Sequence, residues 1–270
     1  MYTLGFLGAG QMGGALLCGL QKQDQNVSCL YYDVSAPRCE ELEKKTRIPA
    51  ERSMAEVMDK VDAAVIAVKP QVYPAVADEI AAHYREGQIL ISVMAGITLE
   101  TLGTMLPPSA KVIRLMPNMA MSVGAGVCLL TANEQVTEVE KQRIKDIFAA
   151  FGLVKVIPEH LMDAGTALSG SGPAFFYTMI DAMMLGGVQA GFARNDAMEL
   201  AVWAMKGAAE LLLETGGSAA VLRDQMMSAG GTTVEGVCAL EKGRFSGDVI
   251  DAVAAACRRS KELSEGGKSK

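Results

Sequence analysis

The fold of this chain is decided by residues 4–15, which read LGFLGAGQMGGA. The apolar segment 3–7 predicts a buried β-strand, and the alanine- and leucine-rich segment 15–20 predicts a helix. Between them the glycines fit the spacing G-x-G-x-x-G, which lets backbone approach a pyrophosphate and presents helix N–H groups to its charge. The order strand, turn, helix therefore predicts a dinucleotide site, the alternative being that the glycines only shape a turn. The expected cofactor contacts are Gly8, Gly10, Gln11, Met12 and Gly13.

A second strand, predicted at residues 28–33, ends in Asp33, about 20 residues after Gly13. In a dinucleotide fold an acid at this position accepts hydrogen bonds from the adenosine ribose and repels a 2′-phosphate, which favours NAD. Ser35 and Arg38 follow closely and are able to bind that phosphate, which favours NADP. The sequence leaves NADH and NADPH both open, and Asp33 is also compatible with an exposed residue at a strand end.

The remaining strand candidates place more residues near the cofactor. Residues 62–68 are almost continuously apolar, as expected for a parallel strand covered on both faces. The next candidates are 88–93, 111–115, 127–131 and 153–157, and helical patterns alternate with the early ones. Ligands of open α/β sheets bind beyond the carboxyl ends of the strands. We therefore expect cofactor contacts from Val68, Lys69, Pro70, Ala95, Gly96 and Asn118.

Two of these residues have an equally good second interpretation. Lys69 is also compatible with a solvated lysine, and asparagine is a common turn former, which fits Asn118. Elsewhere in this part of the chain, two capping boxes predict helix starts: Ser53 with Glu56, and Thr137 with Glu140.

Beyond residue 158 the strand-like runs vanish and helical patterns take over, at 173–190, 195–214, 221–227, 232–242 and 248–263. We therefore expect an α/β Rossmann-type dinucleotide-binding domain, residues 1–158, followed by an all-α domain, residues 159–270, for dimerisation and substrate binding. The first two helices are apolar around most of their circumference, which predicts self-association through a subunit interface. Asp181 and Gln189 argue against a membrane span within 174–193.

Composition narrows the class of protein. Of 270 residues, half are hydrophobic, and 25 basic against 31 acidic residues give a net charge of −6. Because the basic residues are interspersed with acidic ones, nucleic acid and acidic membranes are not expected partners. No signal peptide is evident at the start, and the six scattered cysteines are typical of a reduced, cytoplasmic protein without a zinc site. Neither His83 nor His160 falls in a glycine-rich segment, and no metal site is expected.

Two further glycine-rich segments, 167–173 (ALSGSGP) and 228–233 (SAGGTT), are predicted turns before helices. Glycines and hydroxyls at a helix N-terminus can cradle an anion without a basic residue. Two or three hydrogen bonds to a charged group, worth roughly 1.5 to 3 kcal/mol each, would hold one carboxylate. The alternative for each segment is a helix cap with loop glycines.

These motifs, in their order and spacing, resemble those of pyrroline-5-carboxylate reductase, over nearly the whole chain. The segments that carry the resemblance are the G-x-G-x-x-G start, 68–71 (VKPQ), 114–118 (RLMPN), 166–174 (TALSGSGPA) and 230–233 (GGTT). The resemblance implies a Rossmann domain and a helical dimerisation domain. Members of that family commonly form homodimers, which can assemble further into homodecamers, and the partner subunit completes the active site.

The resemblance also implies roles for single residues. Ser228 and the backbone N–H groups of Gly231 and Thr232 would bind the substrate carboxylate, and the hydroxyl of Thr233 would face the ring nitrogen as the candidate catalytic group. Many relatives have proline where this chain has Ala229, a change that keeps the chemistry of the turn but loosens it. The implied reaction is hydride transfer from NADPH or NADH to the C=N carbon of L-1-pyrroline-5-carboxylate, a cyclic imine carboxylate.

Two other functions remain open from the sequence. A β-hydroxyacid dehydrogenase is expected to carry a lysine four residues beyond Gly172, where this chain has Phe176. A non-catalytic dinucleotide sensor would need the first glycine turn but not residues 230–233. Imine reduction needs chiefly the orientation of two reactants, so the absence of a compact acid–base cluster is compatible with it.

Overall fold

The computed structural model describes residues 1–22 and 27–266 and divides into two compact units. Met1–Gly170 and the end of the chain from Ala256 form the first, here called the sheet unit, and Ser171–Ala255 form the second, the helical unit. The domain boundary expected at residue 158 stays a prediction. Of the last helix, α12 (Phe245–Gly266), the first part belongs to the helical unit and the last part to the sheet unit.

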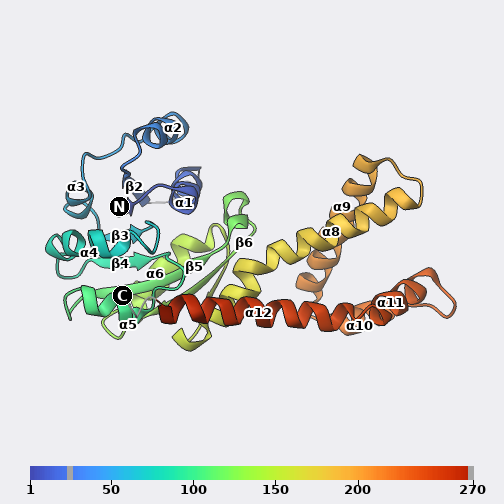
Figure 1. Ribbon diagram of the computed structural model, residues 1–270. Helices are drawn as coiled ribbons and strands as arrows, with labels where there is room; N and C mark the ends of the chain where they lie inside the picture. The colour runs from blue at the N-terminus through green and yellow to red at the C-terminus, as the bar shows by residue number, and fades with distance from the viewer. Residues whose placement is uncertain (23–26, 267–270) are drawn as a thin grey trace. The chain divides into compact units, whose positions relative to one another are not determined.

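The described part of the sheet unit is built around seven strands in the order β2-β1-β3-β4-β5-β6-β7 (Figure 1). Neighbouring strands are parallel except β5 and β6, which are antiparallel. The chain passes from β2 on one side of β1 to β3 on the other, so the order reverses beside β1, the place where such sheets bind ligands. The strands are β1 (Tyr2–Leu7), β2 (Val27–Tyr32), β3 (Ala63–Ile66), β4 (Ile89–Ser92), β5 (Lys111–Pro117), β6 (Gly126–Ala132) and β7 (Gly152–Val156).

Alternate residues of the strands enter two hydrophobic cores, one on each face of the sheet. In β3, Ala63 and Val65 belong to one core while Ala64 and Ile66 belong to the other. The first core is covered by α1 (Gln11–Lys22), α2 (Ala36–Thr46) and α6 (Glu138–Ala149), and the second by α3 (Met54–Met58), α4 (Tyr73–Ala82) and α5 (Leu99–Met105). Burial on both faces explains the continuous apolar run, and the Rossmann-type expectation is confirmed.

The two predicted capping boxes turned out differently. At the start of α6, Thr137 and Glu140 make both reciprocal hydrogen bonds. At the start of α3, the Ser53 hydroxyl accepts from the Glu56 N–H, but Glu56 Oε2 accepts from the N–H of Arg52 at 3.1 Å. The second half of that prediction was therefore wrong. Successive N–H groups of an extended chain point to opposite sides. Before α3, the N–H of Arg52, not that of Ser53, points toward the Glu56 side chain.

The helical unit begins with α8 (Gly172–Gln189) and α9 (Arg194–Thr215), which run side by side as a hairpin (Figure 1). After them come α10 (Ala219–Gln225), α11 (Thr232–Lys242) and the start of α12. Large apolar side chains of α8 and α9 are exposed in the single chain, among them Phe176, Tyr177, Leu200 and Trp203. Across the described residues, none of the helices combines the length and the apolar character that crossing a bilayer would take.

The prediction of a glycine turn at residues 167–173 was wrong, because this segment is helical. A helix α7 (Met162–Gly165) continues as the π-helical segment η3 (Thr166–Ser171) into α8. The hydroxyls of Thr166 and Ser169 donate to the carbonyls of Met162 and Gly165, at 2.8 and 2.9 Å. Such bonds to the carbonyl four residues earlier let Ser and Thr stay within a helix, and single π turns are frequent at functional sites.

A candidate dinucleotide site and a glycine turn before α11

The cofactor residues expected from the sequence gather at one edge of the sheet unit. They follow the carboxyl ends of five strands: Gly8 after β1, Asp33 after β2, Val68 after β3, Ala95 after β4 and Asn118 after β5. Backbone hydrogen bonds join these exits, from Gly8 to the carbonyl of Tyr32 and from Ala67 to that of Leu7. The structure thus places together, at the switch point beside β1, residues that the sequence disperses over 110 positions (118 − 8 = 110).

Each glycine of the first motif has its own physical reason. Gly8 has φ +93°, and a Cβ there would lie 2.9 Å from the carbonyl oxygen of Ala67. A Cβ at Gly13 would overlap the carbonyl oxygen of Gly8, so this glycine lets α1 pack closely on the turn. A Cβ at Gly10 would meet no protein atom within 4 Å. Gly8 and Gly13 therefore serve the fold, and Gly10 leaves open the space that a phosphate would fill.

The start of α1 supplies the donors for such a phosphate. The N–H of Gly14 donates to the carbonyl of Gly10 at 2.9 Å, the first turn of the helix. The N–H groups before it, those of Gln11, Met12 and Gly13, belong to the helix start, where no intrahelical acceptor exists. Directed N–H groups and the positive end of the helix dipole suit a pyrophosphate. The residues present therefore fit a dinucleotide.

Asp33 and Arg38 both hold the glycine turn by the peptide of Ala9. Asp33 Oδ2 accepts from the Ala9 N–H at 2.7 Å and its Oδ1 from the Ser35 N–H at 2.9 Å. On the other side of Ala9, Arg38 Nε donates to its carbonyl at 2.8 Å. Arg38 also donates from Nη2 to the carbonyl of Gly10 at 3.0 Å and from Nη1 to Glu41 at 2.6 Å. Side chains expected to meet the ribose or its phosphate thus contact protein backbone.

Beyond β3 and β4, the expected residues form two tight turns. The carbonyl of Lys69 accepts from the N–H groups of Val72 and Tyr73, which closes a turn through Pro70, while the Lys69 side chain is exposed. Gly96 has φ +76°, and a Cβ there would lie 3.4 Å from the backbone of Leu263, in the part of α12 that belongs to the sheet unit. Both turns lie at the carboxyl edge of the sheet, and the one after β3 is beside the glycine turn of β1; Ala95 is exposed, whereas Gly96 is buried.

The amide of Asn118 joins β5, β6 and the π-helical segment. Its Nδ2 donates to the carbonyl of Ser169 at 2.9 Å and its Oδ1 accepts from the N–H of Val127 at 3.2 Å. Pro173, four residues after Ser169, has no N–H to donate to that carbonyl. The buried Asn118 therefore supplies a missing donor, and its cofactor role stays a prediction.

One charged pair near this edge had no role assigned from the sequence. Arg114 of β5, whose side chain is 3% exposed, donates from Nη1 to Glu159 at 2.8 Å, and the same Glu159 oxygen accepts from the N–H of Leu99. The Arg114 Nε and the other Glu159 oxygen are buried without a partner among the described residues. A charged residue within an apolar strand was the available signal, because such residues are almost never buried unpaired.

The substrate residues expected from the sequence lie in the helical unit, before α11. The N–H of Gly231 donates to the carbonyl of Ser228 at 3.0 Å, and Gly230 has φ +68°, as required in a turn of this kind. A Cβ at Gly231 would overlap the Ser228 hydroxyl. Gly231 is the N-cap of α11 and offers no side-chain cap, while Ser228, Thr232 and Thr233 are exposed. The four predicted residues therefore form one uncapped helix N-terminus that can accept an anion.

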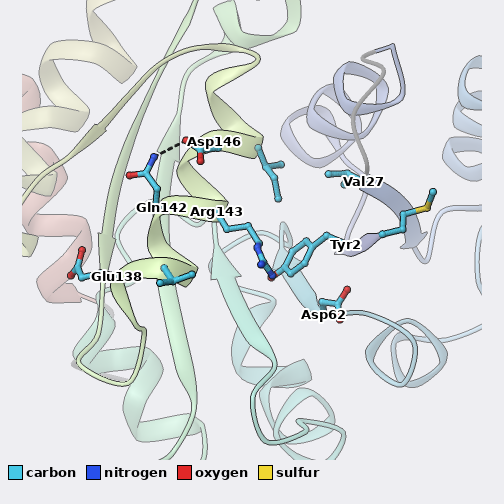
Figure 2. A pocket seen from close by; sticks show the side chains of 10 residues that line it. Tyr2, Val27, Asp62, Glu138, Gln142, Arg143 and Asp146 are labelled. Carbon is cyan, nitrogen blue, oxygen red and sulfur yellow. Dashed lines mark hydrogen bonds between the residues drawn. The ribbon is translucent and has the colours of Figure 1, made fainter.

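A large hollow of the sheet unit lies away from all of these residues. Its volume is about 1290 Å³, and it opens at the amino ends of β1, β2 and β3, opposite the glycine turn. Figure 2 shows Arg143 reaching toward the ring of Tyr2 beside Asp62, with its guanidinium 5.3 Å from the ring centroid. A smaller hollow of about 450 Å³ borders Gln11, Gly14 and Arg38. Among residues 1–22 and 27–266, no three His, Cys, Asp or Glu side chains are grouped for a metal ion.

Comparison with known proteins gives a consistent result. A family model described as pyrroline-5-carboxylate reductase dimerisation matches residues 159–263, and one described as coenzyme F420-dependent NADP oxidoreductase matches residues 3–96. The pyrroline-5-carboxylate reductase of Methanosarcina acetivorans is 36% identical over 264 residues, which cover 96% of this chain and 97% of the relative. That of Escherichia coli is 35% identical, covering 97% and 98%.

Solved structures agree over nearly the full length. The Plasmodium falciparum pyrroline carboxylate reductase with NADP bound is 32% identical, with a TM-score of 0.88, covering 97% of this chain and 98% of that one. The Coxiella burnetii pyrroline-5-carboxylate reductase is 31% identical, with a TM-score of 0.90 and the same coverage. An NADH-preferring ketol-acid reductoisomerase, 16% identical with a TM-score of 0.66, shares the fold alone.

Proposed function

Because this chain belongs to the pyrroline-5-carboxylate reductase family, we propose that it reduces L-1-pyrroline-5-carboxylate to L-proline, the last step of proline biosynthesis. The overall change adds a hydride to the C=N carbon and a proton to the ring nitrogen. NADPH or NADH supplies the hydride when bound, and becomes NADP⁺ or NAD⁺. The observation that carries the proposal is that one chain holds both an open dinucleotide turn and an uncapped glycine turn for a small anion.

The cofactor half of the proposal rests on the carboxyl edge of the sheet unit. The N–H groups at the start of α1 would hold the pyrophosphate beside Gly10. Asp33 keeps acceptor capacity for ribose hydroxyls, since a carboxylate has about four lone-pair sites and the two known bonds use two. The turns after β3 and β4, at Val68, Lys69, Pro70, Ala95 and Gly96, would border the nicotinamide end.

The substrate half rests on the N-terminus of α11. The hydroxyl of Ser228 and the N–H of Thr232 would bind the substrate carboxylate, the N–H of Gly231 would be shared between this carboxylate and the Ser228 carbonyl, and the helix dipole would add to the attraction. Three hydrogen bonds to a charged group, at roughly 1.5 to 3 kcal/mol each, suffice to fix a small acid. The Thr233 hydroxyl would then face the ring nitrogen and orient it.

This chemistry needs little acid–base machinery from the protein. A cyclic imine protonated on nitrogen is already a strong electrophile, so the chain must chiefly orient two reactants and exclude competing reactions. The same argument disfavours a β-hydroxyacid dehydrogenase, which must remove a hydroxyl proton and is expected to carry a lysine where α8 has Phe176.

We further propose that the chain acts as a homodimer in the cytoplasm, with assembly into a homodecamer as a further level. The exposed apolar side chains of α8 and α9 and the match to a dimerisation model over residues 159–263 support self-association. The cofactor and substrate residues lie in different units, and dimerisation is the proposed means by which they serve one reaction.

The direct test is oxidation of NADH and NADPH by the purified protein, followed by absorbance, with and without pyrroline-5-carboxylate. We expect imine-dependent oxidation and formation of L-proline, identified by mass spectrometry. Tight cofactor binding without any oxidation would contradict the proposal and favour a dinucleotide sensor.

A further inference from the structure

Arg38 makes two hydrogen bonds to the backbone of the glycine turn. Its Nε and Nη2 donate to two successive carbonyls, those of Ala9 and Gly10, at 2.8 and 3.0 Å, and its Nη1 donates to Glu41 at 2.6 Å. The fork geometry of a guanidinium suits two neighbouring acceptors. Each nitrogen of this side chain therefore already donates one hydrogen bond within the sheet unit, which uses three of the five N–H groups of Arg38.

The absence of a side chain at Gly14 leaves room for the guanidinium of Arg38. A Cβ at Gly14 would overlap Arg38 Nη2 and lie 3.0 Å from the carbonyl of Ala9. Gly14 is the one glycine of the GQMGG segment that lies outside the G-x-G-x-x-G spacing. Because Gly14 has no side chain, Arg38 of α2 can reach across the first turn of α1.

Together, Asp33 and Arg38 fix the orientation of the turn. Asp33 accepts the Ala9 N–H from one side, and Arg38 takes the Ala9 and Gly10 carbonyls from the other. With these carbonyls turned toward Arg38, the free N–H groups of the helix start are left for the pyrophosphate. Through the turn, Arg38 would act on whichever dinucleotide is bound.

The same contacts leave little to attract a 2′-phosphate. Asp33 and Glu41 place carboxylates on both sides of the Arg38 contacts, and Glu41 also pairs with Lys45 at 2.6 Å. Residues 33–38 contain one cation, and Arg38 is that cation. Val34, directly after Asp33, is 88% exposed and apolar. A phosphate dianion beside residues 33–38 would therefore meet the Asp33 carboxylate and a single cation that is already paired with Glu41.

We propose that Arg38 is a positioning residue that holds the glycine turn, that it is not the ligand of a 2′-phosphate, and that this chain prefers NADH over NADPH. The inference rests on the proposed function, and it names the cofactor that the sequence left open. The observation behind it is that Asp33 and Arg38 bind the two sides of the Ala9 backbone, the N–H and the carbonyl, and that the guanidinium lies against Gly14.

The test compares kcat/KM for NADH and NADPH in the wild type, in Arg38→Gln and in the matched control Arg52→Gln, which removes an exposed arginine away from the turn. For the wild type we expect NADH to be favoured by about tenfold or more. For Arg38→Gln we expect kcat/KM to fall by about tenfold or more with both cofactors, through KM for the cofactor, with the NADH/NADPH ratio unchanged within about threefold. Arg52→Gln should match the wild type.

Two results would overturn the proposal: a wild-type preference for NADPH, or a loss in Arg38→Gln that falls on NADPH alone, as expected of a phosphate ligand. Gly14→Ala provides a second route, because it displaces the guanidinium without deleting the charge, and it should reproduce the uniform loss. If Arg38→Gln fails to fold, the wild-type ratio and Gly14→Ala still decide the question.

Calorimetric titration of NADH and NADPH, without the imine, separates this inference from the proposed function. If the protein binds NADH more tightly but reduces no imine, the proposed function fails while the inference stands. If it reduces the imine but binds NADPH more tightly, the inference fails alone.

Discussion

Asn118 donates its side-chain amide to the carbonyl of Ser169 at 2.9 Å, across 51 residues of sequence, and so replaces the hydrogen bond that Pro173 cannot give. This contact joins the segments 114–118 and 166–174. The first supplies an amide directly after β5, and the second supplies a helix whose Ser169 carbonyl has a proline four residues later. We therefore regard Asn118 and Ser169 as parts of one structural joint within the sheet unit.

Replacing Asn118 by alanine should lower the free energy of unfolding by about 1 to 3 kcal/mol, because the Ser169 carbonyl and the Val127 N–H lose their side-chain partner. Urea denaturation would measure the change. In Pro173→Ala, where an N–H is restored, the same substitution should cost less. Equal costs in both backgrounds would contradict the joint.

Substituting two glycines of the first motif should affect protein stability in one case and cofactor binding in the other. Gly13→Ala brings a Cβ against the Gly8 carbonyl, and we expect a loss of about 1 to 3 kcal/mol in unfolding free energy. Gly10→Ala meets no protein atom, so it should change stability by no more than about 0.5 kcal/mol. It should still weaken NADH binding by about tenfold or more, because the methyl group enters the phosphate space. Thermal unfolding and calorimetric titration of both variants would check this, and normal NADH affinity in Gly10→Ala would refute the placement of the pyrophosphate.

Thr233→Ala should lower kcat/KM for pyrroline-5-carboxylate by about tenfold or more, equivalent to roughly 1.4 kcal/mol, because the imine loses its orienting hydroxyl. Cofactor affinity should stay nearly unchanged, since Thr233 lies in the helical unit and the glycine turn in the sheet unit. Thr104→Ala, which removes an exposed threonine of α5, is the matched control. Wild-type turnover by the Thr233 variant would remove its assigned role.

Stability should fall in alkaline solution. Burial raises the pKa of the Cys128 thiol from 9.0 to about 12 and that of the Tyr73 hydroxyl from 10.0 to about 12. The folded chain therefore holds these protons more tightly than the unfolded chain does. Their stabilising contribution is complete below pH 9 and is lost as the pH rises toward 12. Unfolding free energies across this range should decline less steeply for Cys128→Ala, and a flat profile in the wild type would contradict the expected linkage.

Much of the fold could be predicted from local pattern alone. The almost continuous apolar run of a segment such as 62–68 requires burial on both faces, and the spacing of Gly8 and Gly13 requires a tight turn against a helix, whatever the rest of the chain does. The predicted strands and the helices of the helical unit follow from the same local rules. The segment 167–173 was misjudged, because glycine and serine form turns by propensity, and only the surrounding helix and Asn118 stabilise the π-helical alternative.

The sequence by itself determined that one glycine turn opens a helix after the first strand and that another precedes α11, because backbone conformation at glycine depends on neighbouring residues. Only the tertiary structure decided which polar side chains at the carboxyl edge are free to meet a ligand. Asp33 binds the N–H of Ala9 across 24 residues, Arg38 its carbonyl across 29, and Asn118 the Ser169 carbonyl across 51. Such partners are brought together by the packing of strands and helices, and a hydrogen bond between distant residues leaves no periodic pattern in the sequence.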